Sequence, residues 1–182
     1  MHRMEDDIQE VLFSRDRLKE IVQKMGAQIS KDYEGKNLLM VSVLKGSVVF
    51  LSDLMRAITV PCSIDFMAVS SYGSGVKTSG VVKILKDLDI DLKGYDVLVV
   101  EDILDSGLTL SYILELLQGR SPKSIRLCTL FDKPDRRTVP VQADYVGTVV
   151  PDKFIVGYGL DYAQKYRNLP FVGVLKPKVY GG

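Results

Sequence analysis

Three carboxylates lie close together in one stretch of the chain, directly after a short apolar segment. Glu101 and Asp102 follow the apolar residues 97–100, and Asp105 is the next acidic residue. Four residues continue the stretch: Ser106, Gly107, Leu108 and Thr109. From residue 110 onward the apolar residues have helical spacing, so we expect a buried strand, a short acidic loop and a helix.

This stretch combines two kinds of ligand chemistry. Backbone N–H groups at a helix start can hold a phosphate together with the hydroxyls of Ser106 and Thr109, and Gly107 lets the backbone approach closely. The carboxylates need a different ligand, because they repel phosphate. They can accept hydrogen bonds from neighbouring sugar hydroxyls or bind Mg²⁺. Together these residues predict a site for a ribose 5-phosphate unit, although Asp-Ser-Gly alone is a common turn.

Alternating strands and helices surround this stretch. Ser14 can cap an amphipathic helix with apolar residues at 18, 21, 22, 25 and 29, and a second helix is predicted over 48–55. Strands are predicted over 38–44, 63–71, 81–85, 124–131, 144–150, 154–159 and 171–175. The alternation is typical of a doubly wound α/β domain with a mainly parallel sheet, in which ligands bind beyond the carboxyl ends of the strands.

Composition agrees with a single domain over residues 1–182 and argues against several classes of protein. Hydrophobic residues make up 46% and charged residues 26% of the chain, which is ordinary for a globular protein. The formal net charge of +1 argues against nucleic acid as the main partner. No apolar run reaches the length that a membrane helix needs.

Cysteine and histidine usage argues against a zinc site. Cys62 and Cys128 lie far apart, and His2 is the single histidine. We expect both cysteines to be reduced core thiols in a cytoplasmic protein. The charged, acidic amino-terminal residues are unlike a secretory signal.

A second strand-to-helix loop follows residues 38–44 and contains Lys45, Gly46 and Ser47. A loop lysine is often only a solvated side chain. Backbone amides at a helix start suit anions, however, and here a cation and a hydroxyl accompany them. Beside a sugar-phosphate site, this loop becomes a candidate pyrophosphate site.

The string Val-Val-Glu-Asp-Ile-Leu-Asp-Ser-Gly at 99–107 resembles the phosphoribosyl pyrophosphate (PRPP) motif of type I phosphoribosyltransferases, above all that of the hypoxanthine-guanine phosphoribosyltransferases. The resemblance runs from Leu12 to Leu175 and includes four motifs in family order. It implies the type I phosphoribosyltransferase fold, with a flexible hairpin lid and a small hood built from residues 1–15 and 150–182. It also implies a homodimer or homotetramer that joins hypoxanthine or guanine to PRPP with Mg²⁺, giving IMP or GMP and pyrophosphate.

The resemblance assigns roles within the acidic stretch. Glu101 and Asp102 would hold the ribose hydroxyls and a metal ion, and Ile103 would contact the base. Asp105 would take the proton from purine N7, and the two neighbouring carboxylates should make its ionisation less favourable. Residues 105–109 would hold the phosphate, with Leu108 at a position that varies in the family.

Two further motifs resemble family loops. Lys45 and Gly46 match the pyrophosphate loop, in which the peptide bond between these two residues is often cis. Ser71 and Tyr72 match the lid residues, so the connector 72–80 is interpreted as a lid that closes over the substrate. The alternative is a hairpin tip without a function.

The last third of the chain resembles the family's base-binding segment. Lys133 matches the lysine that reads the purine 6-oxygen, and a donor-only ammonium favours 6-oxopurines over adenine. Phe154 would stack on the purine and Ile155 would contact its edge through the backbone. Asp161 would lie near Mg²⁺ and Arg167 near pyrophosphate, because the arginine fork suits phosphate oxygens. Without the resemblance, Phe154 would be interpreted as a core aromatic and Lys133 as a solvated cation.

Two other functions fit the same motifs. A PRPP-sensing regulator with this fold could bind RNA or DNA, although it would need a strongly basic face. A related transferase could use xanthine or adenine, and Lys133 argues against adenine only. The sequence does not rank hypoxanthine, guanine and xanthine.

Overall fold

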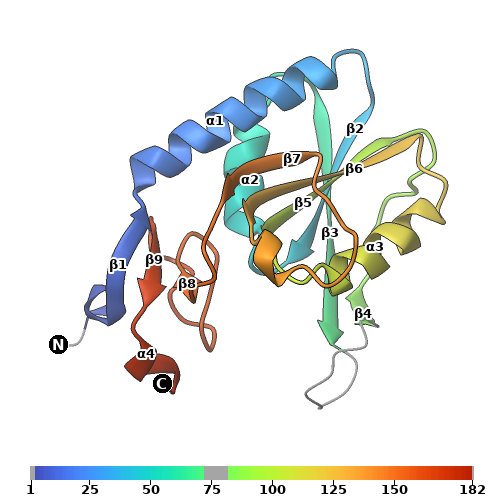
Figure 1. Cartoon of the computed structure of the whole chain (residues 1–182). Helices are drawn as coiled ribbons and strands as arrows, with labels where there is room; N and C mark the ends of the chain where they lie inside the picture. Colours follow the sequence, from blue (N-terminus) through green and yellow to red (C-terminus); the bar gives the residue numbers. More distant parts are fainter. Residues whose placement is uncertain (1–2, 72–81, 182) are drawn as a thin grey trace.

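The computed structural model describes residues 3–71 and 82–181, which form a large sheet, a small sheet and the helices that cover them (Figure 1). The large sheet has six strands in the order β4-β3-β2-β5-β6-β7. Their bounds are Leu38–Leu44 (β2), Cys62–Ser71 (β3), Val82–Lys86 (β4), Asp96–Leu104 (β5), Ser124–Asp132 (β6) and Tyr145–Val149 (β7). Every neighbouring pair is parallel except β3 with β4, so the predicted mainly parallel α/β sheet is confirmed.

Helices cover both faces of the large sheet. Helices α1 (Arg15–Asp32) and α2 (Val48–Ala57) pack on one face, where Leu18, Phe50 and Leu98 belong to one buried cluster. Helix α3 (Leu108–Gln118) packs on the other face through a second cluster that includes Ile113. The sheet is therefore doubly wound, as the sequence predicted.

Helix α1 begins where the sequence predicted. The Ser14 hydroxyl accepts a hydrogen bond from the Arg17 backbone N–H at 3.2 Å, which satisfies one of the free donors of the first turn. No helix within residues 3–71 and 82–181 is long and apolar enough to span a bilayer.

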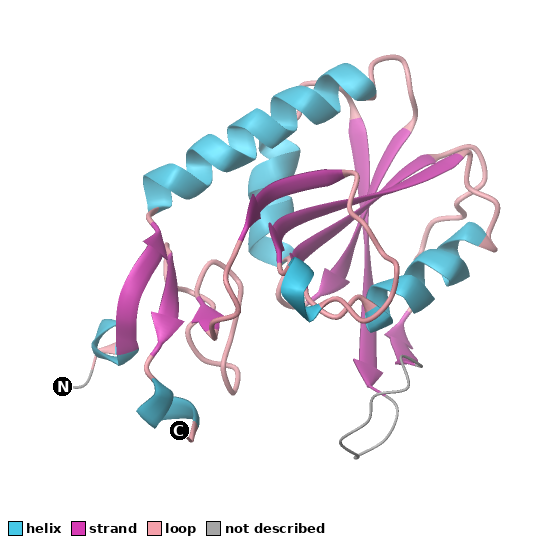
Figure 2. Cartoon of the chain, viewed as in Figure 1, coloured by secondary structure: helices cyan, strands magenta, loops and turns pink. Residues whose placement is uncertain are grey.

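The two ends of the described chain meet in the small sheet, which has the strand order β1-β9-β8 (Figure 2). Its strands are Ile8–Phe13 (β1), Val172–Leu175 (β9) and Ile155–Val156 (β8), and all its pairings are antiparallel. The 3₁₀ turn η1 (Met4–Asp7) precedes β1, and the short helix α4 (Pro177–Tyr180) follows β9. Val156, Tyr166, Leu169 and Leu175 form a separate buried cluster in its core, whereas Ile155, Val172 and Val174 belong to the main cluster that includes Phe131.

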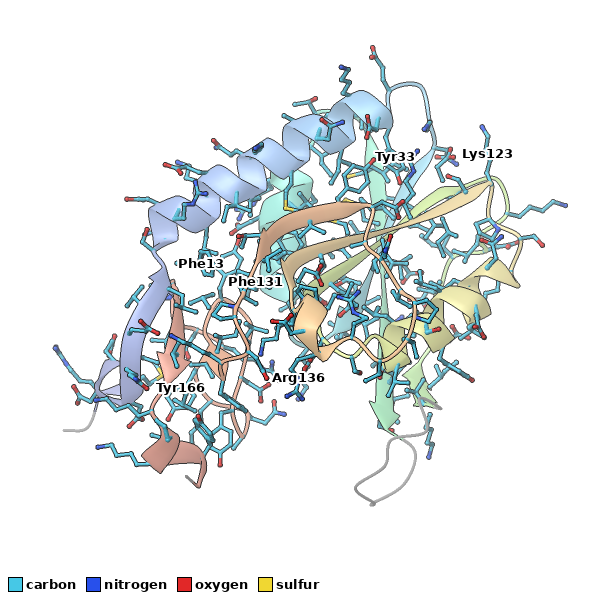
Figure 3. The ribbon with its side chains drawn as sticks, viewed as in Figure 1. Phe13, Tyr33, Lys123, Phe131, Arg136 and Tyr166 are labelled. Atoms are coloured by element: carbon cyan, nitrogen blue, oxygen red, sulfur yellow. The ribbon has the colours of Figure 1, made fainter. Side chains whose placement is uncertain are left out.

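One aromatic contact joins the two sheets. The rings of Phe13 in β1 and Phe131 in β6 lie 5.2 Å apart between centroids (Figure 3). Phe131 is fully buried, so the small sheet is anchored on the core of the large one at this point.

Four local features differ from the sequence prediction. Strand β5 continues to Leu104 and pairs with β6 up to Asp132, so Glu101 and Asp102 belong to the strand and not to a loop. The predicted strand 154–159 shortens to β8, because the backbone turns at Gly157–Gly159 with positive φ. The cis peptide bond is Leu44–Lys45, one residue before the expected Lys45–Gly46 bond. The turn η2 (Pro134–Arg136) was not predicted.

Candidate active site

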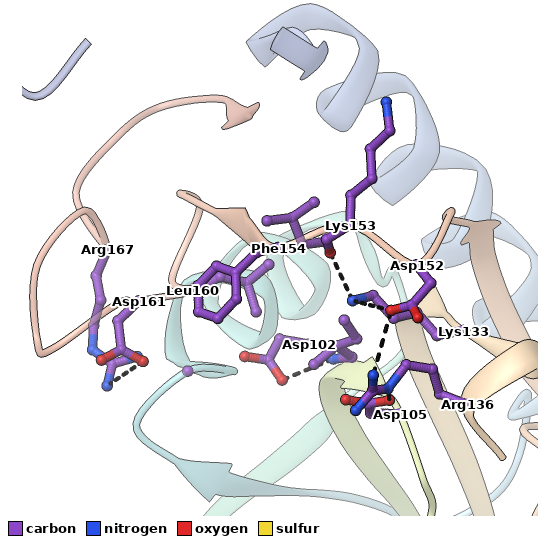
Figure 4. A pocket seen from close by; sticks show the side chains of 13 residues that line it. Asp102, Asp105, Lys133, Arg136, Asp152, Lys153, Phe154, Leu160, Asp161 and Arg167 are labelled. Carbon is purple, nitrogen blue, oxygen red and sulfur yellow. Dashed lines mark hydrogen bonds and ion pairs between the residues drawn. The ribbon is translucent and has the colours of Figure 1, made fainter. Parts of the chain in front are cut away.

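A cavity of about 620 Å³ opens beyond the carboxyl ends of β2, β5 and β6, with the segment 152–167 as its opposite wall (Figure 4). Nine predicted site residues line it: Gly46, Asp102, Ile103, Asp105, Lys133, Phe154, Ile155, Asp161 and Arg167. Four other residues complete the lining: Arg136, Asp152, Lys153 and Leu160. Parallel strands present their carboxyl ends at one edge, which is why residues more than a hundred positions apart meet here.

A second, smaller cavity of about 150 Å³ adjoins the first, because Ile103 and Asp105 line both. Four other predicted residues line it: Glu101, Ser106, Gly107 and Thr109. Gly107 has φ +84° and precedes the first residue of α3, so the chain turns sharply into the helix start. The predicted combination of hydroxyls and free helix N–H groups is therefore formed.

Asp102 is buried and Glu101 beside it is partly buried, so the two form a largely buried acidic pair. Burial, followed by the charge of Asp102, raises the pKa of Glu101 well above its usual range. Its Oε1 atom is shielded from solvent and has no hydrogen-bond partner in the part of the chain that the structure describes. Burial raises the pKa of Asp102 to about 6, although the Ile103 backbone N–H donates to its Oδ1 at 2.8 Å. Burial, the largest cause, therefore makes the ionised form of both carboxyl groups unfavourable.

The loop after β2 lies directly against Asp102. A Cβ atom built on Gly46 would overlap the Oδ2 atom of Asp102, so only glycine fits without movement of its surroundings. Gly159, with φ +99°, lies against the carbonyl oxygen of Gly46 in the same way. The segments that contain Gly46, Asp102 and Gly159 thus approach so closely that no further side chain fits between them. The sequence analysis did not select Gly159. The Gly-Tyr-Gly spacing at 157–159 was its available signal.

Lys133 is buried in the cavity wall and is only 8% exposed. Its ammonium donates to the carbonyl oxygen of Lys153 at 2.8 Å and lies 4.0 Å from a carboxylate oxygen of Asp152. A solvated side chain has no such partners, so the alternative of a merely exposed lysine is wrong for this structure.

Asp105 is paired with Arg136, to which the sequence analysis gave no role. The Arg136 Nε donates to Asp105 Oδ1 at 2.9 Å, and its Nη1 lies 3.6 Å from Asp152 (Figure 4). We expected the neighbouring carboxylates to dominate the surroundings of Asp105. The burial of these carboxylates differs, because Asp102 is buried whereas Asp105 is about half exposed and faces Arg136.

Asp161 and Arg167 form the opposite wall as an ion pair. Arg167 Nη2 lies 3.1 Å from Asp161 Oδ1, and its Nη1 donates to the carbonyl oxygen of Gly159 at 2.8 Å. The buried Nε of Arg167 has no partner among the described residues. Lys45 lies nearby, with its ammonium 3.4 Å from the Gln164 side-chain oxygen. Within residues 3–71 and 82–181, no three acidic, histidine or cysteine side chains are grouped to hold a metal ion.

A family model for the phosphoribosyl transferase domain matches residues 11–163. The chain belongs to the phosphoribosyl transferase family. Its sequence is 54% identical over 177 residues to a bifunctional protein TilS/HprT of Listeria monocytogenes, but the chain spans only 27% of that protein's length. It is 51% identical to a hypoxanthine-guanine phosphoribosyltransferase of Streptococcus pyogenes, covering 97% of this chain and 98% of the relative.

A solved structure extends the family likeness to the fold. The crystal structure of a hypoxanthine phosphoribosyltransferase from Staphylococcus aureus superposes with a TM-score of 0.96 at 50% identity, covering 98% of this chain and 97% of that one. The family resemblance and the type I phosphoribosyltransferase fold that the sequence motifs suggested are therefore confirmed.

Two predicted site residues of this phosphoribosyl transferase domain, Lys45 and Leu108, are described but are not among the lining residues of the two cavities. Leu108 is the first residue of α3, and its backbone N–H donates to the Ser106 hydroxyl at 3.4 Å. Ser71 ends β3, where its backbone pairs with Val82. Tyr72 and the lid connector lie outside the described residues.

Proposed function

We propose that this chain transfers the 5-phosphoribosyl group of PRPP to N9 of hypoxanthine or guanine, giving IMP or GMP and pyrophosphate. One observation carries the proposal. A phosphate-type helix start, a largely buried acidic pair and a buried lysine converge on two adjoining cavities, with an exposed phenyl ring on the opposite wall. Relatives that match along nearly their whole length are named hypoxanthine-guanine phosphoribosyltransferases, which supports the same activity here.

The smaller cavity suits the ribose 5-phosphate. Ser106, Thr109 and the free N–H groups of the α3 start would bind the phosphate, because these donors point at one small volume. The unpartnered Oε1 of Glu101 would accept a hydrogen bond from a ribose hydroxyl. A sugar therefore supplies the donor that this buried oxygen lacks.

The larger cavity suits the purine. Phe154 is 39% exposed and would stack on the base, with Ile103 and Ile155 beside it. Lys133 would donate to the 6-oxygen in place of, or in addition to, its bond to the Lys153 carbonyl. An ammonium cannot accept the hydrogen bond that the 6-amino group of adenine offers, so the site favours 6-oxopurines.

Asp105 lies between the two cavities and is the candidate base for the purine N7 proton. Its partner Arg136 is solvent-exposed, and exposed ion pairs contribute little to stability. The pair can therefore open when a purine arrives, which frees the Asp105 carboxylate to accept the N7 proton.

Mg²⁺ fits this donor set, although the described residues include no group of three side chains that would hold it by themselves. Mg²⁺ typically binds one or two carboxylates together with substrate phosphates and water. Asp102 and Asp161 line one cavity from opposite walls, and both would serve once PRPP supplies the remaining oxygens. Bound Mg²⁺ would neutralise charge on the departing pyrophosphate. Arg167 and Lys45 would bind the same leaving group, since the buried Arg167 Nε is a donor without a partner among the described residues.

The deciding experiment supplies the purified protein with PRPP, Mg²⁺ and each purine base in turn, and follows nucleotide formation. We expect turnover with hypoxanthine and guanine and none with adenine. Lys133→Ala should lower kcat/KM for both oxopurines about 5- to 100-fold, because one partner of a buried hydrogen bond is lost. Lys123→Ala, which removes an exposed lysine far from the cavity, is the matched control.

Unchanged kcat/KM for both bases in Lys133→Ala would remove the 6-oxygen role from this lysine. Failure of the wild-type protein to turn over any base, with PRPP binding retained, would refute the proposed activity. That result would favour the PRPP-sensing regulator instead.

A further inference from the structure

Three aromatic rings from the last third of the chain contact one another beside the base cavity. The ring of Phe154 stacks on that of Tyr180, with 4.8 Å between centroids and 21° between the planes. Tyr162 meets Phe154 edge-on at 5.7 Å and 87°, and meets Tyr180 at 6.3 Å and 67°. Each ring therefore contacts the other two.

Of the three rings, only that of Phe154 belongs to a lining residue of the cavity. Tyr180 stacks on one face of the phenyl ring, which leaves the other face for a ligand. A purine stacked on the free face would make Phe154 the middle of a three-layer stack.

Hydrogen bonds fix the segment that leads from β9 to Tyr180 beside Phe154. The Leu175 N–H donates to the carbonyl oxygen of Phe154 at 2.9 Å, five residues before Tyr180. The next N–H, of Lys176, donates to the Asp7 carbonyl at 2.9 Å, and its ammonium donates to the Asp6 carbonyl at 2.6 Å. Strand β9 therefore bonds to the Phe154 backbone and leads directly into α4, whose Tyr180 ring stacks on the Phe154 side chain.

Packing fixes the position of Tyr180 further. Its side chain is partly buried against the core of the small sheet, which contains Val156, Tyr166, Leu169 and Leu175. Phe154 by contrast is among the few exposed large apolar side chains. An exposed phenyl ring samples several orientations unless a neighbour restricts it, and ordering it would reduce affinity for the base.

We infer that Tyr180 is a positioning residue for the nucleobase, which holds the Phe154 ring in the orientation that stacks on a purine. The inference rests on the proposed function, because Phe154 needs a base to stack on. It assigns α4 a role in base affinity, with no direct contact between Tyr180 and the substrate. The effect belongs to the KM for the base and not to the KM for PRPP.

The test compares Tyr180→Ala, Tyr180→Phe and Lys178→Ala in steady-state assays with hypoxanthine and PRPP varied separately. We expect Tyr180→Ala to raise the KM for hypoxanthine about two- to tenfold, which is what an aromatic pair contributes. The KM for PRPP should stay within about twofold. Tyr180→Phe keeps the ring and should behave as wild type, as should Lys178→Ala, an exposed change in the same helix.

Tyr180→Leu guards against a loss of folding. It keeps an apolar side chain on the small-sheet core but removes the stacked ring, so the KM for hypoxanthine should rise while Tm stays close to that of wild type. An unchanged KM for hypoxanthine in both Tyr180→Ala and Tyr180→Leu would overturn the inference. A lowered KM would also overturn it, because Tyr180 would then compete with the base.

Equal increases in both KM values would overturn the inference as well, since they indicate general damage to the fold. Failure of the proposed function is recognised separately. If the proposed function is wrong, the wild-type protein forms no nucleotide. If only the role of Tyr180 is wrong, the wild-type protein forms nucleotide and the Tyr180 variants have the same KM for hypoxanthine.

Discussion

Asp102→Asn should stabilise the protein in the absence of substrates. The carboxyl group of Asp102 is buried, and its pKa rises to about 6 chiefly because burial disfavours the charged form. At pH 7.5 the wild-type protein must nevertheless carry this charge next to Glu101, whose pKa the charge raises further. Asparagine keeps the oxygen that accepts the hydrogen bond from the Ile103 N–H and removes the charge.

The magnitude follows from the size of the shift. The pKa of Asp102 is about 6 in the folded protein and 3.8 ordinarily, and a difference of about two units corresponds to about 3 kcal/mol. Because the folded state binds the proton more tightly, wild-type stability falls as the pH rises from about 4 to 6. Relaxation around the charge reduces the full value, so we expect a gain of about 1–3 kcal/mol at pH 7.5. This corresponds to a Tm increase of roughly 2–10 °C.

The assay is thermal or urea unfolding of wild type and Asp102→Asn from pH 4 to 8, without PRPP, purines or divalent cations. Ligands must be absent because they stabilise the folded state by mass action. The difference in unfolding free energy should be small near pH 4 and reach its full value above pH 6. The rate of nucleotide formation should fall in Asp102→Asn, because the Asp102 carboxylate that destabilises the free protein is also a proposed substrate ligand.

Asp87→Asn is the matched control, because its expected change in the free energy of unfolding has the opposite sign. Two hydrogen bonds of 2.8 Å from Arg120 lower the pKa of Asp87, so its removal should destabilise the protein at pH 7.5. That loss should shrink as the pH falls through the lowered pKa. A Tm for Asp102→Asn equal to or below that of wild type across the whole pH range would refute the reasoning about the buried charge.

Three further outcomes are expected. Gly46→Ala should lower the free energy of unfolding by about 1–3 kcal/mol and raise the KM for PRPP, because the new methyl group overlaps Asp102. Gly119→Ala is the control, since a methyl group fits there, and it should change neither thermal unfolding nor the KM. Asp105→Asn should lower kcat about 10²- to 10⁴-fold in single-turnover assays while PRPP binding by calorimetry is retained; a decrease below about threefold would exclude Asp105 as the base. Excess EDTA should abolish turnover and added Mg²⁺ or Mn²⁺ restore it, whereas full activity in EDTA would exclude a metal requirement.

The strands, the helices and the family could be predicted because each depends on local sequence. Valine-rich runs such as 97–100 are typical of strands buried on both faces, and β2, β5 and β6 form at the predicted places. The ends of parallel strands share one edge, so the convergence of Asp102 and Lys133 on one cavity follows from the topology alone. Relatives with the same motifs then confirm the family.

The features that could not be predicted depend on tertiary contacts. Arg136 was one of three cations in a loop, and only the fold shows that it pairs with Asp105. The same holds for the raised pKa values, since burial depends on packing from all sides and not on spacing along the chain. The ends of β5 and β8 were misplaced because ladder pairing and positive φ angles override the apolar pattern.

The close approach of Gly159 to Gly46 adds a backbone contact between the two walls of the site. Ile155 and Leu160 of the opposite wall share a buried cluster with the large sheet, whereas Tyr166 and Leu169, on either side of Arg167, belong to a separate cluster. Gly159 fits against the Gly46 carbonyl without a side chain between them, and its own N–H and C=O bond to Arg167 at 2.9 and 2.8 Å. The wall that carries Arg167 is thereby placed at backbone contact distance from the loop against Asp102. A side chain at either glycine would widen the cavity at the point where, in the proposed function, a metal ion and pyrophosphate must bridge both walls.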